Sequence, residues 1–98
     1  MKTIISKLNK AFENRVRLGI MSVLMVNEWV DFNALKELLE TTDGNLASHL
    51  KMLEEKELIT VKKQFVGRKP NTSYQATVQG KKQFREHLAA LEKIIKQR

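Results

Sequence analysis

One stretch of the sequence, residues 42–78, combines residue types and spacings that suit the binding of an anionic polymer. Leu46, Leu50 and Leu53 recur at i, i+4 and i+7, which is typical of the buried face of a helix. The opposite face would carry small polar or cationic groups able to reach base edges and phosphates. These groups belong to Asn45, Ser48 and either His49 or Lys51. A helix of this kind fits a DNA major groove.

The same stretch continues into a predicted β-hairpin with a cationic tip. Over residues 59–65 the hydrophobic period becomes two, which is typical of a strand. Gly67 and Pro70 mark a loop, and we expect neither to lie in a regular strand. The loop holds two adjacent cations, Arg68 and Lys69. A helix that fits the major groove, followed by a positively charged loop, predicts double-stranded DNA as the partner.

Positive charge is concentrated in the second part of the chain. The 98 residues carry a net charge of +7. Residues 58–98 contain ten Lys or Arg and two Asp or Glu, whereas residues 1–57 contain eight and nine. This asymmetry favours an anionic partner, with nucleic acid first and an anionic membrane surface second. The alternative is that these side chains only keep a small domain in solution.

The composition restricts the class of protein. Hydrophobic residues at 42% and charged residues at 30% are typical of a folded soluble chain, and residues 1–98 are expected to form a single domain. No run approaches the roughly 20 apolar residues of a membrane span, and the N-terminus is unlike a signal peptide. We therefore expect a cytoplasmic protein without a membrane partner. With no cysteine and two isolated histidines, we expect neither a metal site nor a cofactor.

Nothing in the sequence favours catalysis. It contains no Gly-rich phosphate loop, no nucleophile-elbow pattern and no carboxylate pair in a plausible cleft. We expect a binding protein with no catalytic residues.

Several helices are predicted to position these groups. Residues 3–26 look helical, as a short and a longer helix separated near Asn14. Residues 29–32 are predicted as a short strand or connector, and Asp31 or Asn33 would cap the next helix. That helix, about 33–40, would present three leucines to the core: Leu35, Leu38 and Leu39.

The predicted elements define a fold class. Thr41–Gly44 combines turn and cap residues between two short helices, and this arrangement is a helix-turn-helix unit. Together with the hairpin and a long C-terminal helix, it predicts a mainly α, α+β winged helix-turn-helix with a two- or three-stranded antiparallel sheet.

The C-terminal helix, capped by Thr77 and running to about residue 96, has an apolar seam. Its members are spaced four, three and four residues apart, as in a coiled coil. The seam could pack onto its own domain, but we expect it to form a homodimer interface with the apolar residues of the N-terminal segment. A two-fold dimer would place two recognition helices roughly 34 Å apart. The expected interface residues are Ile4, Ile5, Leu8, Phe12, Phe84, Leu88, Leu91 and Ile95.

Four motifs in order give the chain a family resemblance. Residues 15–21 resemble the opening Asn/Pro-x-Arg-x-x-Ile-Leu of winged-helix regulators of the ArsR and MarR type. Residues 46–54 are similar to their recognition-helix signature, Val-Ser-x-His-Leu-x-x-Leu. Residues 58–59 match the strand that follows, and residues 74–80 match the junction of the wing and the last helix. The resemblance covers about residues 12–96.

The resemblance implies roles for matching residues. Thr42 and Asp43 would meet the major groove together with the polar helix face. Lys51 would contact phosphate, and Arg15 and Arg17 would clamp the DNA backbone. Wing residues would reach phosphates or the minor groove. The wing residues are Arg68 and Lys69 at the tip, with Lys62 and Lys63 at the base, of which one could face away.

The resemblance also implies a transcriptional regulator, and we expect a repressor. Ser48 replaces a long cation found in many relatives, so we expect the helix to select the site and the wing to supply much of the affinity. Without cysteine, metal sensing by the ArsR route is not expected. A small-molecule effector remains open. The alternative function is a protein- or RNA-binding module, because the same fold serves those partners.

Three single residues complete the predictions. His49 is either a base-contacting residue or one bonded within the motif. His87 is expected to be solvated or at an interface, and Trp29 to be an anchor in the core or the dimer, although it could line an effector pocket.

Overall fold

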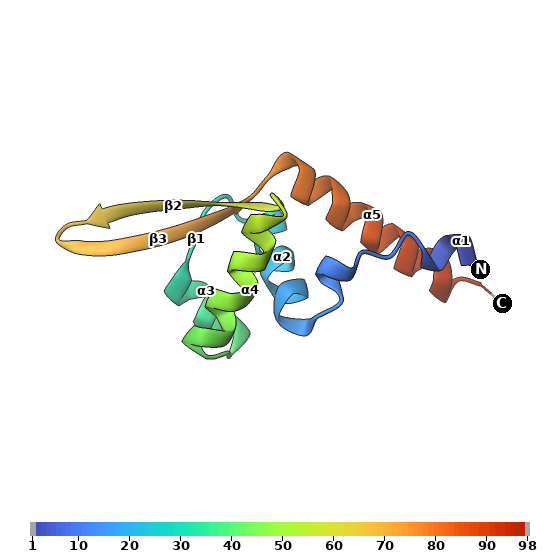
Figure 1. Cartoon of the computed structure of the whole chain (residues 1–98), viewed down its shortest axis with the longest axis horizontal. Helices are drawn as coiled ribbons and strands as arrows, with labels where there is room; N and C mark the ends of the chain where they lie inside the picture. The colour runs from blue at the N-terminus through green and yellow to red at the C-terminus, as the bar shows by residue number, and fades with distance from the viewer. Residues whose placement is uncertain (1, 98) are drawn as a thin grey trace.

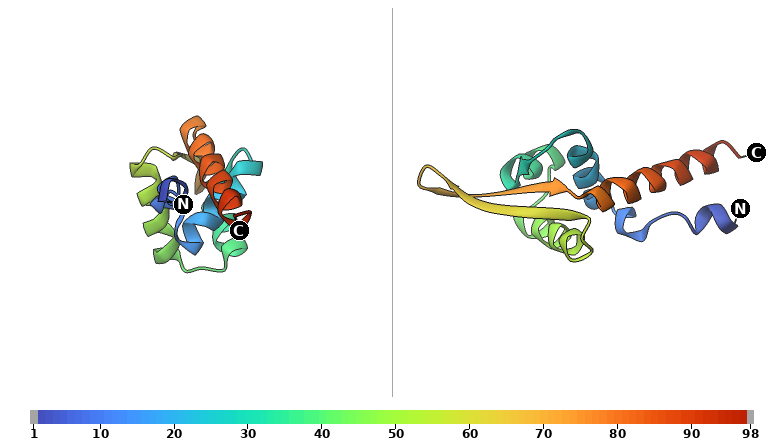
Figure 2. Two further views of the ribbon diagram at one scale, coloured as in Figure 1. Left: turned by 90° about the vertical axis from the view of Figure 1, so that its right-hand side faces the viewer. Right: turned by 90° about the horizontal axis from the view of Figure 1, so that it is seen from above.

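The computed structural model describes residues 2–97, an elongated body of 56 × 25 × 21 Å (Figure 1). A β-hairpin projects from one end, and the two chain termini lie together at the other (Figures 1 and 2). The main helices fill the space between. The elements in order are α1 (Lys2–Ile5), the 3₁₀ helix η1 (Lys10–Phe12), α2 (Arg15–Val26), β1 (Val30–Asp31), α3 (Phe32–Leu39), α4 (Asp43–Glu55), β2 (Ile59–Val66), β3 (Lys69–Ala76) and α5 (Val78–Ile95).

Helix starts are fixed by side-chain caps, as predicted for Thr77 and for Asp31, which was one of two candidates with Asn33. Asn14 accepts from the N–H groups of the first turn of α2, Asp31 caps α3, Thr42 caps α4 and Thr77 caps α5. Such caps satisfy N–H groups that have no partner within the helix. The continuous helix predicted before Asn14 is correct only in part, because α1 ends at residue 5 and η1 occupies only 10–12.

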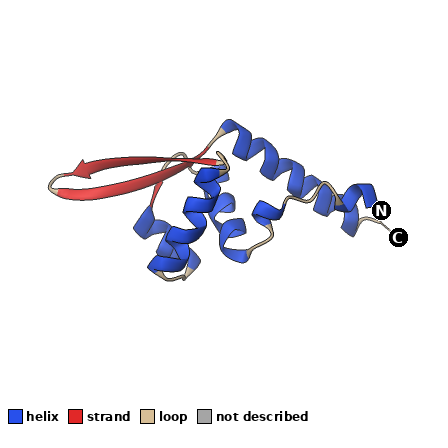
Figure 3. Ribbon diagram, viewed as in Figure 1, coloured by secondary structure: helices blue, strands red, loops and turns tan. Residues whose placement is uncertain are grey.

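The strands form one antiparallel sheet in the order β1-β3-β2, which Figure 3 shows in red. Gly67 and Arg68 form the two-residue turn of the hairpin, and Gly67 has the positive φ of 66° that glycine tolerates best. The prediction that Pro70 lies outside a strand is wrong, because it pairs with Phe65. β1 pairs with β3 only at residues 73 and 74. At Pro70 the edge of β3 that would face β1 therefore has no partner strand, and a proline there removes no hydrogen bond.

The core forms between α2, α4, the sheet and the start of α5. Leu46, Leu50 and Leu53 of α4 are buried in it, as predicted. In α3, Leu35 is fully buried and Leu39 packs close to Gly19 of α2. Leu38, also expected in the core, is 63% exposed. The two-turn helix α3 contacts α2 with the side that bears Leu35 and Leu39, so Leu38 remains on the solvent side.

Phe12 and Phe84 join η1 to α5 within the chain. Their rings meet edge to face, with centroids 5.0 Å apart, and both side chains are buried. The expectation that these two phenylalanines face a partner does not fit their burial, since the chain's own core already covers them. Leu88, Leu91 and Ile95 of the same seam remain exposed.

The junction between the hairpin and α5 depends on a close backbone approach. The Thr77 hydroxyl donates to the carbonyl of Glu57 and accepts from the N–H of Gly80, and the Thr77 N–H donates to the carbonyl of Leu58. A Cβ added to Gly80 would lie 2.0 Å from the Leu58 carbonyl oxygen. Only glycine allows α5 to start this close to β2.

Gly80→Ala is expected to lower the free energy of unfolding by about 1–3 kcal/mol, because backbone must shift to admit the methyl group. Gly44→Ala is the matched control. A Cβ at Gly44 meets no atom within 4 Å, so in α4 it should stabilise the fold by up to about 1 kcal/mol. Urea unfolding midpoints measure both changes. Equal midpoints for the two variants would contradict the close-approach argument.

Candidate nucleic-acid interface

The outer face of α4 is polar and open to solvent. Ser48 and Asn45 are exposed, and the spacing 45, 48, 49 places these two side chains and His49 on one helix face. The Asn45 amide donates to the Thr41 hydroxyl at 3.0 Å, while the Thr42 hydroxyl accepts from the Asn45 N–H at 3.2 Å. The Asn45 side-chain oxygen forms no hydrogen bond within the described residues, so the face offers amide and hydroxyl groups at its surface.

Asp43 at the start of α4 has a cationic partner. Its carboxylate lies 2.8 Å from the Nζ of Lys36 in α3. The pair is largely exposed, and such pairs contribute only about 0–1 kcal/mol to stability. Its consequence for a nucleic acid is electrostatic, because Lys36 offsets the negative charge that Asp43 would bring near phosphates.

A shallow basic groove separates α4 from the hairpin. Lys51 of α4 and Lys63 of β2 both line this space of about 150 Å³. Lys62 points elsewhere, with its Nζ 4.2 Å from the centre of the Trp29 ring. Trp29 itself is 36% exposed, so it is not an anchor in the core. Of the two lysines at the wing base, Lys63 is therefore the one that faces α4.

A tyrosine also lines the groove. Tyr74 on β3 lines the groove together with Glu54. Burial, and to a lesser degree the Glu54 charge, raise the pKa of the Tyr74 hydroxyl above its ordinary value. The hydroxyl, protonated near neutral pH in any case, can donate a hydrogen bond.

The wing tip combines cations with apolar side chains. Arg68 and Lys69 are exposed, as expected. Phe65 is 72% and Val66 60% exposed. The period of two over residues 59–65 predicts that Phe65 lies on the same strand face as Ile59, which is buried. Phe65 is exposed because the outer part of the hairpin extends beyond the helices and has no layer beneath it (Figure 1).

The two arginines of α2 have different surroundings. Arg15 is exposed at the start of the helix, where a phosphate could approach it. Arg17 is half-buried, and all three of its guanidinium nitrogens contact groups of the chain itself. One of these groups is the Nδ1 atom of His49 on α4, at 2.9 Å. A position near the DNA backbone fits Arg15 better than Arg17.

His87 is buried, contrary to the prediction of a solvated or interface residue. It is 3% exposed and lies against the rings of Phe12 and Phe84. Its Nδ1 atom accepts a hydrogen bond of 2.9 Å from the backbone N–H of Asn9. Burial lowers the pKa of His87, and the Glu13 charge opposes this to a lesser degree. The imidazole is a structural acceptor that ties α5 to the N-terminal segment.

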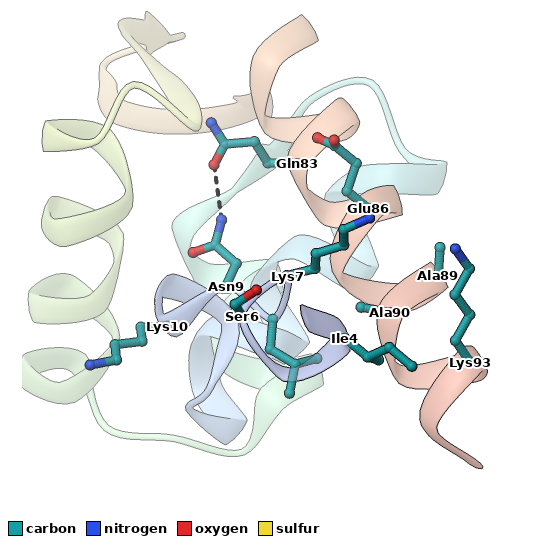
Figure 4. A pocket seen from close by; sticks show the side chains of 11 residues that line it. Ile4, Ser6, Lys7, Asn9, Lys10, Gln83, Glu86, Ala89, Ala90 and Lys93 are labelled. Atoms are coloured by element: carbon teal, nitrogen blue, oxygen red, sulfur yellow. Dashed lines mark hydrogen bonds between the residues drawn. The ribbon is translucent and has the colours of Figure 1, made fainter. Parts of the chain in front are cut away.

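A wider groove lies between the N-terminal segment and α5. It has a volume of about 690 Å³ and is lined by side chains that include Lys7, Glu86 and Lys93 (Figure 4). Two further lining residues are hydrogen bonded across the two segments: the side-chain amide of Asn9 donates to the side-chain oxygen of Gln83 at 2.9 Å.

Apolar side chains remain exposed at this terminal end of the molecule. Ile95 is 79%, Ile5 56%, Leu88 43% and Leu91 37% exposed. Ile4 and Leu8 of the N-terminal segment are half-buried. Six of the eight residues expected at a dimer interface are therefore at least partly accessible.

Other types of site lack support in the part of the chain that the structure describes. Residues 2–97 contain no group of three or more His, Cys, Asp or Glu placed to hold a metal ion. Within the same range, no helix has the length and apolarity to cross a membrane.

Comparison with known proteins identifies the class. Residues 16–95 match the family described as winged helix DNA-binding domain. An uncharacterized protein of Methanocaldococcus jannaschii is 36% identical over 87 residues, which cover 89% of this chain and 95% of that protein.

Solved structures show the same fold. A transcriptional regulator homologue from Pyrococcus horikoshii OT3 superposes with a TM-score of 0.84 at 31% identity, over 96% of this chain and 91% of that one. MepR of S. aureus, solved as a DNA complex, gives a TM-score of 0.77 at 17% identity over 98% and 79% of the two chains, a likeness in fold alone. The chain belongs to the winged-helix DNA-binding domain family, and its fold is that of transcriptional regulators of the MarR and HlyU type.

The buried His87 generates a pH prediction. Because its folded pKa lies below the ordinary 6.5, its contribution to stability is fully present above pH 6.5 and is lost as the pH falls through the lower folded pKa. The wild-type free energy of unfolding should therefore decrease between about pH 7.5 and about pH 5. His87→Asn keeps a side-chain acceptor that does not titrate, so its decrease should be smaller. Urea unfolding at the two pH values measures the difference, and an identical decrease in both proteins would contradict this role.

Proposed function

We propose that this DNA-binding regulator is a sequence-specific repressor that binds duplex DNA as a homodimer. The observation that carries the proposal is the exposed polar face of α4, flanked by the basic groove between Lys51 and Lys63. A helix can enter the major groove with its polar face while cations on both sides contact the phosphates.

The proposed contacts divide into two classes. Thr42, Asn45, Ser48 and His49 present hydroxyl, amide and imidazole groups that can hydrogen bond to base edges. Cationic side chains would neutralise phosphates and supply most of the affinity. The cations are Arg15, Lys51, Lys63, Arg68 and Lys69.

Dimerisation is supported by the exposed seam of α5 and the neighbouring N-terminal segment. Leu88, Leu91 and Ile95 follow one another at helical spacing and are left uncovered by the chain itself. Both termini lie at the end opposite the wing, so pairing at the termini would leave the wings free (Figure 1). A second copy would double the phosphate contacts of a small domain.

Repression is proposed because the α4 face and the wing offer a DNA-binding surface, and occlusion of a promoter needs only binding and release.

Removing wing and helix contacts should have different effects on DNA binding. Arg68→Ala with Lys69→Ala should weaken all duplexes about equally and make the slope of log K against log salt shallower by roughly two per protomer. Asn45→Ala and Ser48→Ala should instead change base preference, each at a cost of about 1–3 kcal/mol on the preferred site. Duplex selection from a random pool and salt titrations measure the two effects.

The matched control is Lys82→Ala with Arg85→Ala, which removes the same charge from exposed positions of α5. It should alter the slope less than the wing variant does. A wild-type protein that retains no duplex at low salt, or whose binding hardly depends on salt, would overturn the proposal. A palindromic selected site would support the dimer.

A protein-binding role is the second candidate, favoured by the exposed Phe65 and Val66 at the wing tip. Apolar side chains so far from the core suit a protein partner better than a phosphate backbone. Weak, salt-insensitive duplex binding would favour this alternative.

Leu88→Glu with Leu91→Glu should shift the protein towards monomer, because dimerisation would bury unpaired carboxylates. The dissociation constant of the dimer should rise at least about tenfold, measured by sedimentation equilibrium. The control, Val26→Glu with Leu38→Glu, adds the same charges at positions that are 82% and 63% exposed. It should leave the dissociation constant of the dimer unchanged. A monomeric wild type, or equal effects of the two double variants, would contradict the proposed interface.

A further inference from the structure

The side chain of Arg17 joins three segments of the chain. Its Nε donates to the carbonyl oxygen of Ala11 at 2.7 Å, and one terminal nitrogen reaches the carbonyl oxygen of Lys10 at 3.5 Å. The other terminal nitrogen lies 2.9 Å from Nδ1 of His49. Arg17 therefore connects η1 and α2 to the outer face of α4.

This contact determines which nitrogen of His49 carries the proton. A guanidinium has only donors, so Nδ1 of His49 must accept and bears no hydrogen. A neutral imidazole has one N–H, which is then on Nε2. Burial first, and the Arg17 charge second, lower the pKa of His49, which keeps the ring neutral near pH 7.

The Nε2–H of His49 is not fully enclosed by the chain. Within residues 2–97 the Nε2 atom has no hydrogen-bond partner. In the same range, every side-chain nitrogen or oxygen that is fully buried does have a partner. It follows that Nε2 is accessible to solvent. His49 shares its helix face with the exposed Asn45 and Ser48.

We propose that Arg17 is a positioning residue that holds His49 as an Nε2–H donor, and that His49 reads a hydrogen-bond acceptor in the major groove. The inference rests on the proposed DNA-binding function and adds a base preference to it. Guanine offers N7 and O6 there, adenine N7 and thymine O4, whereas cytosine offers only an amino donor. The base facing His49 should therefore be any base except cytosine.

The alternative role of Arg17, a clamp on the DNA backbone, fits the geometry less well. Bidentate phosphate binding uses two parallel N–H groups of one guanidinium. In Arg17, Nε and both terminal nitrogens are already directed at Ala11, His49 and Lys10.

The first experiment measures the tautomer of His49 in the free protein. Two-bond ¹H–¹⁵N correlation spectra should show the Nε2–H form in the wild type and a mixture of tautomers in Arg17→Met. The pKa of His49 should rise in that variant because the neighbouring charge is gone. Arg17→Lys keeps the positive charge but loses the forked donor geometry of the guanidinium. In this variant the pKa of His49 should therefore return close to the wild-type value, while the tautomer mixture should be only partly corrected. A wild-type Nδ1–H form, or identical spectra in all three proteins, would overturn the proposal that Arg17 sets the tautomer of His49.

The second experiment measures base preference by duplex selection. In His49→Gln the side-chain amide can donate from a position near that of Nε2, whereas in His49→Asn the amide reaches only as far as Nδ1. The wild type should disfavour cytosine at one position by about tenfold or more, and His49→Gln should do so less strongly, because its amide oxygen can also accept from the cytosine amino group. His49→Asn and Arg17→Met should lose that preference there and keep the preferences at other positions.

The outcomes separate this inference from the proposed function. If Arg17→Met weakens all duplexes equally and makes the salt slope shallower by about one, Arg17 is a phosphate clamp and the inference fails while DNA binding stands. If the wild type retains no duplex, both the proposed function and the base contact fail. The spectra of the free protein then still decide whether Arg17 sets the tautomer.

Discussion

The rest of the structure depends on the burial of three leucines on one face of α4. Leu46, Leu50 and Leu53 are at most 2% exposed, and together they fix the rotation of the helix about its axis. Once that face is buried, Asn45 and Ser48 must lie on the opposite side, because a helix repeats every 3.6 residues. The burial of these side chains is worth roughly 1.5–3 kcal/mol each. The polar face is thus held outward by the same interaction that stabilises the core.

A short irregular segment links this helix to the terminal end of the molecule. Asn9 is bonded to α5 through His87 and Gln83. Two residues further on, the carbonyl of Ala11 accepts from Arg17, which also contacts α4. Segment 9–12 therefore touches, directly or through one side chain, both the helix proposed for dimerisation and the helix proposed for base contact. Its backbone groups are used for tertiary contacts because a single 3₁₀ turn leaves most of them without partners inside the helix.

Local chemistry made much of the fold predictable. Asp31 and Thr77 were recognisable as candidate caps because side chains of this type satisfy N–H groups of the next few residues. The recognition helix and the hairpin were recognisable by their hydrophobic periods. The expected dimer seam was only partly consistent with the structure. Phe84 fits the seam by spacing, yet its ring packs on Phe12 inside the chain. Spacing identifies an apolar face but does not tell whether its own domain or a partner covers it.

The sequence by itself determined most of the elements from α2 onward, the polar face of α4 and the location of the basic charge, since these follow from periodicity, capping and composition. Only the tertiary structure decided which side chains are free to act there. It directed Lys63 rather than Lys62 towards α4, and it engaged Arg17 with His49, which lies 32 positions away. It also buried His87 against a backbone N–H. The reason is physical: local patterns depend on neighbours within a few residues, whereas hydrogen bonds between distant segments exist only after the core has brought those segments together.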